Sequence, residues 1–138
     1  MTFKVKNKKV KEKNSFAVER EKEKLDLSGF HGTEAYHSGY MGVKLTDGAY
    51  FVGSNNASWL ITDISSVLKV EPKVKDEEFV SVKFKVSADN KAEVTYEDGN
   101  GKELYKQKYN YTDFNKTFKE KEVHFFYTND VLMLSGEY

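Results

Sequence analysis

The four residues Asp98-Gly99-Asn100-Gly101 separate two segments in which large and charged side chains alternate. Asn-Gly is a strong signal for a tight β-hairpin, because both residues of such a turn must accept a positive φ. A two-residue loop at Asn100-Gly101 places Tyr96 opposite Tyr105 and predicts an aromatic seam on one face of the hairpin. The other face then carries charged side chains, namely Glu93, Glu97, Lys106 and Lys108.

The alternation continues on both sides of this hairpin and predicts further strands. Apolar side chains recur at every second residue over 80–86, 92–96, 105–111 and 123–127, and an apolar segment follows at 131–134. Turn-forming residues stand at 89–90 and 128–130. Strands joined by such short turns predict an antiparallel meander with one face in water.

Helices are expected ahead of these strands. Over 57–68 the apolar residues recur at helical spacing and form one stripe, with Asn55 or Asn56 as the N-cap. A second, charge-rich helix is expected over 16–25. Between the two helices, Asp47-Gly48 predicts either a tight hairpin turn or the start of a short helical turn.

Helices followed by an antiparallel sheet indicate the α+β class. The length of 138 residues is that of one domain. We therefore expect a four- to six-stranded antiparallel sheet, ending in the meander, packed by one or two helices. This domain covers 14–138 and follows a basic N-terminal arm or edge strand over 1–13.

The formal net charge of zero conceals a segregation of charge along the chain. Residues 1–24 hold nine Lys or Arg against four Glu, and residues 25–138 hold thirteen against eighteen Asp or Glu. The arm is either a frayed terminus or a segment that contacts an anionic partner such as nucleic acid. Its lysines are Lys4, Lys6, Lys8, Lys9, Lys11 and Lys13.

Several kinds of site are excluded by composition. The chain has no cysteine, so it has no disulfide, no thiolate zinc site and no cysteine nucleophile. No apolar run approaches the roughly 18–20 residues that span a bilayer. No apolar stretch follows the N-terminal lysines, so we expect no secretory signal, no membrane contact and a cytoplasmic protein.

Several motifs in order along 30–138 resemble those of an uncharacterised family of small proteins from bacteria, phages and other mobile elements. They are Gly32-Thr33-Glu34-Ala35-Tyr36, Thr46-Asp47-Gly48, Trp59–Ile64, Asp98–Gly101, Tyr111–Phe114 and, at the terminus, Val131–Leu134 with Glu137-Tyr138. The chain departs from the family pattern at His37-Ser38-Gly39, after Phe114 and at Gly136. The resemblance implies one compact domain, a mobile-element origin and a bacterial host cell, and it supplies no chemistry.

One group of residues has the right types for a metal site. His31, Glu34 and His37 could offer two imidazoles and a carboxylate to a divalent ion. Their spacing of three and six residues does not align on one helical face, and Gly32 disfavours a helix there. The sequence contains no nucleophile elbow and no phosphate loop. We therefore predict no catalytic residue, no metal site and no cofactor.

The aromatic content points to a binding surface. Nine tyrosines and ten phenylalanines exceed what the centre of a core of this size holds, and tyrosine is favoured at protein interfaces. The alternative is that these rings pack helix onto sheet. The candidate interaction residues beside the lysines of the arm are Tyr36, His37, Tyr40, Tyr50 and Phe51.

These observations predict a non-enzymatic protein–protein interaction module that acts by occluding its partner. With a mobile-element origin, the expected partner is a host defence nuclease, which makes the chain a candidate anti-CRISPR-like inhibitor. One alternative is a nucleic-acid-binding accessory protein that uses the lysine arm. Another is a small metal-dependent enzyme centred on His31, Glu34 and His37. The sequence leaves the oligomeric state open.

Overall fold

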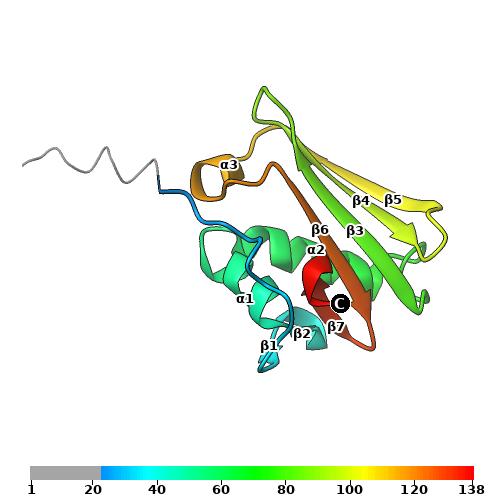
Figure 1. Ribbon diagram of the computed structural model, residues 1–138. Coiled ribbons are helices and arrows are strands. Elements are labelled where there is room, and N and C mark those ends of the chain that lie inside the picture. Colours follow the sequence, from blue (N-terminus) through cyan, green and yellow to red (C-terminus); the bar gives the residue numbers. More distant parts are fainter. Residues whose placement is uncertain (1–22) are drawn as a thin grey trace, which may run out of the picture.

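The structure is a computed structural model, and its described part covers residues 23–138. Seven strands form one sheet in the order β1-β2-β7-β6-β3-β4-β5 (Figure 1). The strands are β1 (His37–Ser38), β2 (Lys44–Leu45), β3 (Phe79–Val86), β4 (Ala92–Asp98), β5 (Glu103–Tyr109), β6 (Glu122–Thr128) and β7 (Val131–Leu134). The helices are α1 (Asp47–Ser54), α2 (Ser58–Val70) and α3 (Phe114–Thr117), with single 3₁₀ turns at η2 (Tyr40–Gly42) and η3 (Ser135–Glu137).

The α+β class is confirmed, but the sheet has more strands than the predicted four to six. The two additional strands, β1 and β2, have two residues each. Strands this short show no alternation that a sequence pattern could detect. The sheet is also mixed, because β2 runs parallel to β7 while every other neighbouring pair is antiparallel.

The predicted meander is wrong in one connection. The strand that follows β5 in the chain, β6, does not pair with β5. It pairs with β3, on the side of β3 that faces away from β4. The connection over 110–121 contains α3, whose Phe114 is buried and stacks on buried Phe118 at a centroid distance of 4.5 Å. Burial of these two rings anchors the crossover at the end of the core.

The hairpin at 98–101 has the predicted register, with Tyr96 opposite Tyr105 and Glu93 opposite Lys108. The loop itself has three residues instead of two. The Asp98 N–H donates to the Lys102 carbonyl at 2.9 Å, and only Gly101 has a positive φ, of 84°. The ladder then shifts by one residue after Tyr96, which restores the register.

The helix predicted over 57–68 is confirmed as α2, which buries its apolar stripe. Its N-cap is Ala57 and not a predicted asparagine, because Asn56 has a φ of 67° and lies outside the helix. At Asp47-Gly48 the hairpin turn is wrong and the helical alternative is right. Thr46 caps α1 by accepting a hydrogen bond from the Ala49 N–H at 3.4 Å.

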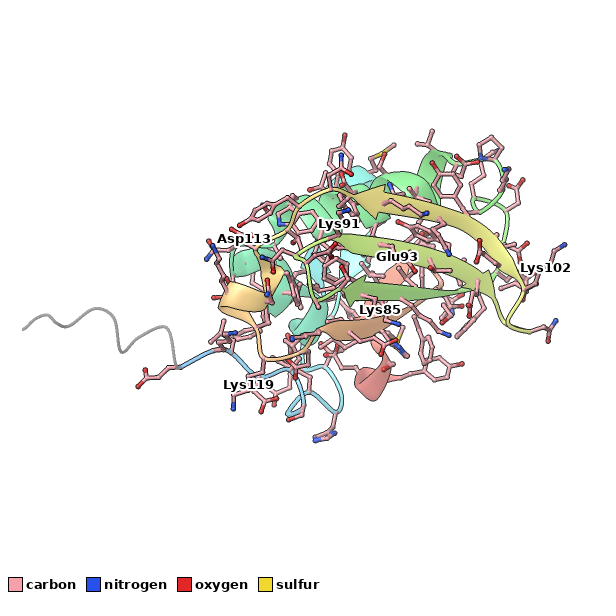
Figure 2. The ribbon with its side chains drawn as sticks, turned by 90° about the horizontal axis from the view of Figure 1, so that it is seen from above. Lys85, Lys91, Glu93, Lys102, Asp113 and Lys119 are labelled. Atoms are coloured by element: carbon pink, nitrogen blue, oxygen red, sulfur yellow. The ribbon has the colours of Figure 1, made fainter. Side chains whose placement is uncertain are left out.

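Helices α1 and α2 lie side by side against one face of the sheet, where the core is buried (Figure 1). The opposite face carries the charged side chains that the hairpin register predicted. Lys85 lies beside Glu93 on neighbouring strands of this face (Figure 2). The ion pairs on this face are partly exposed, as in the pair of Lys83 with Glu97 at 3.4 Å. Each therefore contributes about 1 kcal/mol at most to stability.

The N-terminal predictions fall mostly outside the described residues. This holds for the arm over 1–13 and for most of the helix over 16–25. The end of that helix is wrong, because Leu25 forms a parallel bridge with Phe118. Among residues 23–138, none of the helices is both long and apolar enough to cross a membrane.

Candidate functional site

Two segments that are far apart in the sequence meet at the start of α1. The Glu137 carboxylate, near the end of the chain, accepts hydrogen bonds from the Thr46 hydroxyl at 2.6 Å and from the Gly48 N–H at 2.9 Å. It also accepts from the Leu134 N–H at 2.9 Å. A carboxylate is well placed here, because the first N–H groups of a helix lack intrahelical partners and carry partial positive charge.

Gly48 is required by this close approach. A Cβ at residue 48 would lie 2.5 Å from Glu137 Oε1 and 2.6 Å from Leu134 Cδ1, well inside van der Waals contact. The absence of a side chain therefore lets Glu137 reach the backbone of α1. The end of the chain and the start of α1 are fixed to each other by this contact.

Asp47 joins the same helix start to the segment that precedes β1. Its carboxylate accepts from the Glu34 N–H and from His37 Nε2, both at 2.9 Å, and its own N–H donates to the Thr33 hydroxyl at 2.8 Å. The hydrogen bond from the Glu34 backbone, followed by the one from His37, holds the pKa of Asp47 below its usual value. Asp47 is therefore ionised at neutral pH and fixes the His37 ring.

His37 in turn fixes the ring of Tyr50 at the surface. The two rings are stacked, with centroids 4.0 Å apart and planes 10° from parallel. Tyr50 is nevertheless 46% exposed. The result is a tyrosine held in one orientation with one ring face toward solvent, so little rotamer entropy would be lost when a partner covers it.

Tyr50 belongs to a group of exposed large side chains that we call the aromatic surface. Its members and their exposed fractions are Tyr36 (62%), Tyr40 (51%), Met41 (45%) and Tyr50 (46%). With about 200 Å² for each complete side chain, the exposed parts amount to roughly 400 Å². This figure is a sum over four side chains, of which Tyr40 and Tyr50 line one groove, and exposed large side chains that gather in this way often mark a binding site.

The backbone of this surface contains an unfavourable conformation. Met41 has a φ of 56°, in the left-handed region that costs a non-glycine residue about 1 kcal/mol. Tyr40 and Tyr50 also line a shallow groove of about 190 Å³, whose floor includes Leu45 and Ile61. The surface therefore offers both protruding side chains and a small apolar recess.

From the predicted interaction residues the structure brings together His37, Tyr40 and Tyr50: His37 stacks on Tyr50, and Tyr40 lines the same groove as Tyr50. Tyr36 is exposed and precedes His37 in the chain. Phe51 does not belong with them, because its half-buried ring packs against Phe30 at 5.2 Å. Met41 was not predicted, since nothing in the sequence marks its positive φ except the glycine that follows. The predicted lysines, Lys4, Lys6, Lys8, Lys9, Lys11 and Lys13, lie outside the described residues.

The three residues of the alternative metal-site reading, His31, Glu34 and His37, do not converge. His37 is bound to Asp47, whereas His31 lines a separate shallow groove beside Glu122 and His124. Glu34 contacts Asp47 through its backbone N–H, and its own side chain is exposed. Within residues 23–138, no group of three or more His, Asp or Glu side chains could hold a metal ion.

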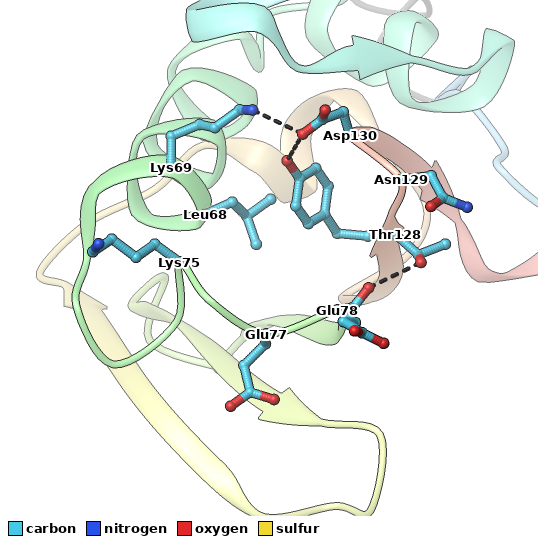
Figure 3. A pocket seen from close by; sticks show the side chains of 9 residues that line it. Leu68, Lys69, Lys75, Glu77, Glu78, Thr128, Asn129 and Asp130 are labelled. Atoms are coloured by element: carbon cyan, nitrogen blue, oxygen red, sulfur yellow. Dashed lines mark hydrogen bonds and ion pairs between the residues drawn. The ribbon is translucent and has the colours of Figure 1, made fainter.

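A larger polar pocket of about 500 Å³ lies beside the turn between β6 and β7 (Figure 3). Lys69 Nζ pairs with the Asp130 carboxylate at 2.8 Å, and the Tyr127 hydroxyl donates to the same carboxylate at 3.0 Å. The hydrogen bond to Asp130 raises the pKa of Lys69. The hydrogen bonds from Lys69 and then from Tyr127 lower the pKa of Asp130. Lys69 is thus held in its protonated form by an ion pair within the fold.

A family model described as a family of unknown function (DUF6876) matches residues 21–138, which is most of the chain. No curated protein and no solved structure matches.

Proposed function

The chain belongs to this family of unknown function (DUF6876), and we propose that it is a non-enzymatic protein that binds a protein partner through its aromatic surface. The observation that carries the proposal is the exposure of Tyr36, Tyr40, Met41 and Tyr50 on one fixed scaffold. Tyrosine and methionine are enriched at protein interfaces, whereas charged residues are depleted at their centres.

The surface is prepared for binding in two respects. The stacked His37 ring already restricts Tyr50, so a partner that covers Tyr50 immobilises few additional rotors. Met41 has a positive φ, which is energetically unfavourable, and its apolar side chain is 45% exposed. Burial of apolar surface by a partner would supply about 25 cal/mol per Å² before the costs of association.

We propose a host defence nuclease as the partner, met in the cytoplasm of a bacterial host and inhibited by occlusion. The support for this finer statement is the resemblance of the sequence motifs to proteins of phages and mobile elements. A small protein that covers a nuclease surface needs no chemistry of its own. The polar residues around α1 agree with this role, because their hydrogen-bonding groups are engaged within the fold.

The test places a photocrosslinking amino acid at Tyr40 or, as a control, at Val70. Val70 is also exposed, by 54%, but lies at the far end of α2. The two proteins are produced in bacteria that carry CRISPR or restriction nucleases, and crosslinked partners are identified by mass spectrometry. We expect one partner to be captured from residue 40 and not from residue 70.

The captured nuclease is then assayed for DNA cleavage with increasing amounts of the chain. The wild-type protein should inhibit cleavage, and the Y36S/Y40S double variant should inhibit at least tenfold less well, since interface tyrosines are frequent hot spots. Equal crosslinking from both positions would contradict binding through the aromatic surface. If a specific partner is captured but its DNA cleavage is unchanged by the chain, the proposal of nuclease inhibition is contradicted and binding through the aromatic surface is not.

A further inference from the structure

A second group of aromatic side chains surrounds a pocket apart from the aromatic surface. The pocket holds about 260 Å³ and lies where the first turn of α2, the end of β5 and the segment before α3 meet. We call it the aromatic pocket. Its lining residues are Trp59, Tyr109, Tyr111, Thr112 and Asp113.

Two walls of the pocket are rings set at a steep angle. Trp59 and Tyr109 have centroids 5.3 Å apart and planes 69° from parallel. Each ring is held from behind: Trp59 packs edge-on against Phe84 at 6.0 Å, and the Tyr109 hydroxyl donates to Asp63 at 2.8 Å. The walls are therefore fixed before any ligand arrives.

The third ring, Tyr111, is 60% exposed. Its hydroxyl accepts a hydrogen bond of 3.4 Å from Lys116 Nζ, and Lys116 does not line the pocket. Three aromatic rings line this one small space, and the face of an aromatic ring carries negative electrostatic potential because of its quadrupole.

Two carboxylates add negative charge to the same place. Asp113 lines the pocket and lies at the start of α3, where Figure 2 labels it. Asp63 lies behind Tyr109. In the part of the chain that the structure describes, neither carboxylate forms an ion pair with a lysine, arginine or histidine.

From this geometry we propose that the aromatic pocket binds a methylated ammonium group. A rounded trimethylammonium head contacts several ring faces at once, and steeply angled rings suit that shape. A planar guanidinium instead stacks on a single ring. An uncharged group of the same shape would gain nothing from Asp113 or from the ring quadrupoles. This site is independent of the proposed protein interface.

The chain contains its own probe, because Trp59 is its single tryptophan. Tryptophan emission is followed during titration with tetramethylammonium chloride, with sodium chloride added to hold the ionic strength constant. Choline is then compared with its neutral carbon isostere, 3,3-dimethylbutan-1-ol. We expect saturable binding of both cations, and choline binding about 5- to 30-fold tighter than the isostere. Trimethyllysine and choline, titrated side by side, distinguish a modified protein from a small metabolite as the source of the ammonium group.

Matched variants locate the site. Tyr111→Ala removes an exposed ring and should weaken tetramethylammonium binding at least fivefold, whereas Tyr111→Phe keeps the ring face and should bind within about twofold of wild type. Asp113→Asn should weaken binding of the cation and leave binding of the neutral isostere unchanged. Circular dichroism confirms that each variant is folded. No saturation with tetramethylammonium, equal binding of choline and its isostere, or unchanged binding by Tyr111→Ala would each overturn the proposal.

Discussion

Replacement of Glu137 by alanine should destabilise the fold far more than an ordinary surface substitution. Glu137 is the penultimate residue, a position where side chains commonly contribute little. In this protein its carboxylate accepts three hydrogen bonds from two separate segments, including the Gly48 N–H at the start of α1. Its removal leaves that N–H and the Thr46 hydroxyl without this acceptor.

The magnitude follows from the kind of hydrogen bond. A hydrogen bond to a charged group contributes about 1.5–3 kcal/mol, and a carboxylate at a helix N-terminus adds about 0.3–1 kcal/mol. These contributions are not additive, and Glu137 is only half-buried, so water replaces part of what is lost. We expect Glu137→Ala to lower the free energy of unfolding by about 2–4 kcal/mol. For a chain of this length the melting temperature then falls by about 6–15 °C.

Urea unfolding at pH 7, followed by circular dichroism, measures this difference. Glu137→Gln keeps an acceptor oxygen and should lose about half as much stability. The matched control is Glu103→Ala on β5, which removes an exposed carboxylate whose ion pair with Lys106 spans 3.8 Å. The control should change stability by no more than about 0.5 kcal/mol. If Glu137→Ala were as mild as the control, the three hydrogen bonds would not hold the terminus to α1.

Gly48→Ala should lower the free energy of unfolding in urea by about 1–3 kcal/mol, because the added Cβ would overlap Glu137. If the Gly48→Ala/Glu137→Ala double variant lost as much stability as the two single variants added together, the two sites would not interact. The pKa of Asp98 is lowered by the hydrogen bonds it accepts from the loop N–H groups, so its contribution to stability is present above about pH 4 and is lost as the pH falls below that. Acid unfolding of Asp98→Asn should therefore begin from a lower stability and depend less steeply on pH between 4 and 2; an identical slope would refute this. Burial and then Asp63 raise the pKa of Tyr109, so stability should fall as the pH rises above 10, and Tyr109→Phe should show a shallower alkaline decline by fluorescence-detected unfolding.

The part of the fold that could be predicted is the part with a visible period. Alternation identified the long strands, and the helical stripe identified α2, because both patterns extend over many residues. The choice of neighbour could not be predicted: nothing in the alternation of β6 shows that it pairs with β3 instead of β5. The segment after Thr46 was ambiguous for a different reason, since Asp-Gly suits a turn and Thr-Asp suits a helix start equally well.

The candidate sites divide in the same way. The excess of tyrosine predicted that Tyr36, Tyr40 and Tyr50 would serve binding, because residues close in sequence often share a surface. The aromatic pocket could not be predicted, since Trp59 and Tyr111 are far apart in the chain and meet only through the packing of α2 on β5. Long-range contacts of this kind carry no local signal.

The polar residues near α1 have their hydrogen-bonding groups engaged within the fold. Asp47 and Glu137 are carboxylates beside a histidine and a helix N-terminus, a combination that in other settings activates a nucleophile. In this fold both carboxylates accept hydrogen bonds from within the chain. Asp47 accepts from His37 and from the Glu34 backbone, and Glu137 accepts from three donors. What these contacts leave exposed is Tyr50, one ring face still covered by His37, beside the other aromatic side chains.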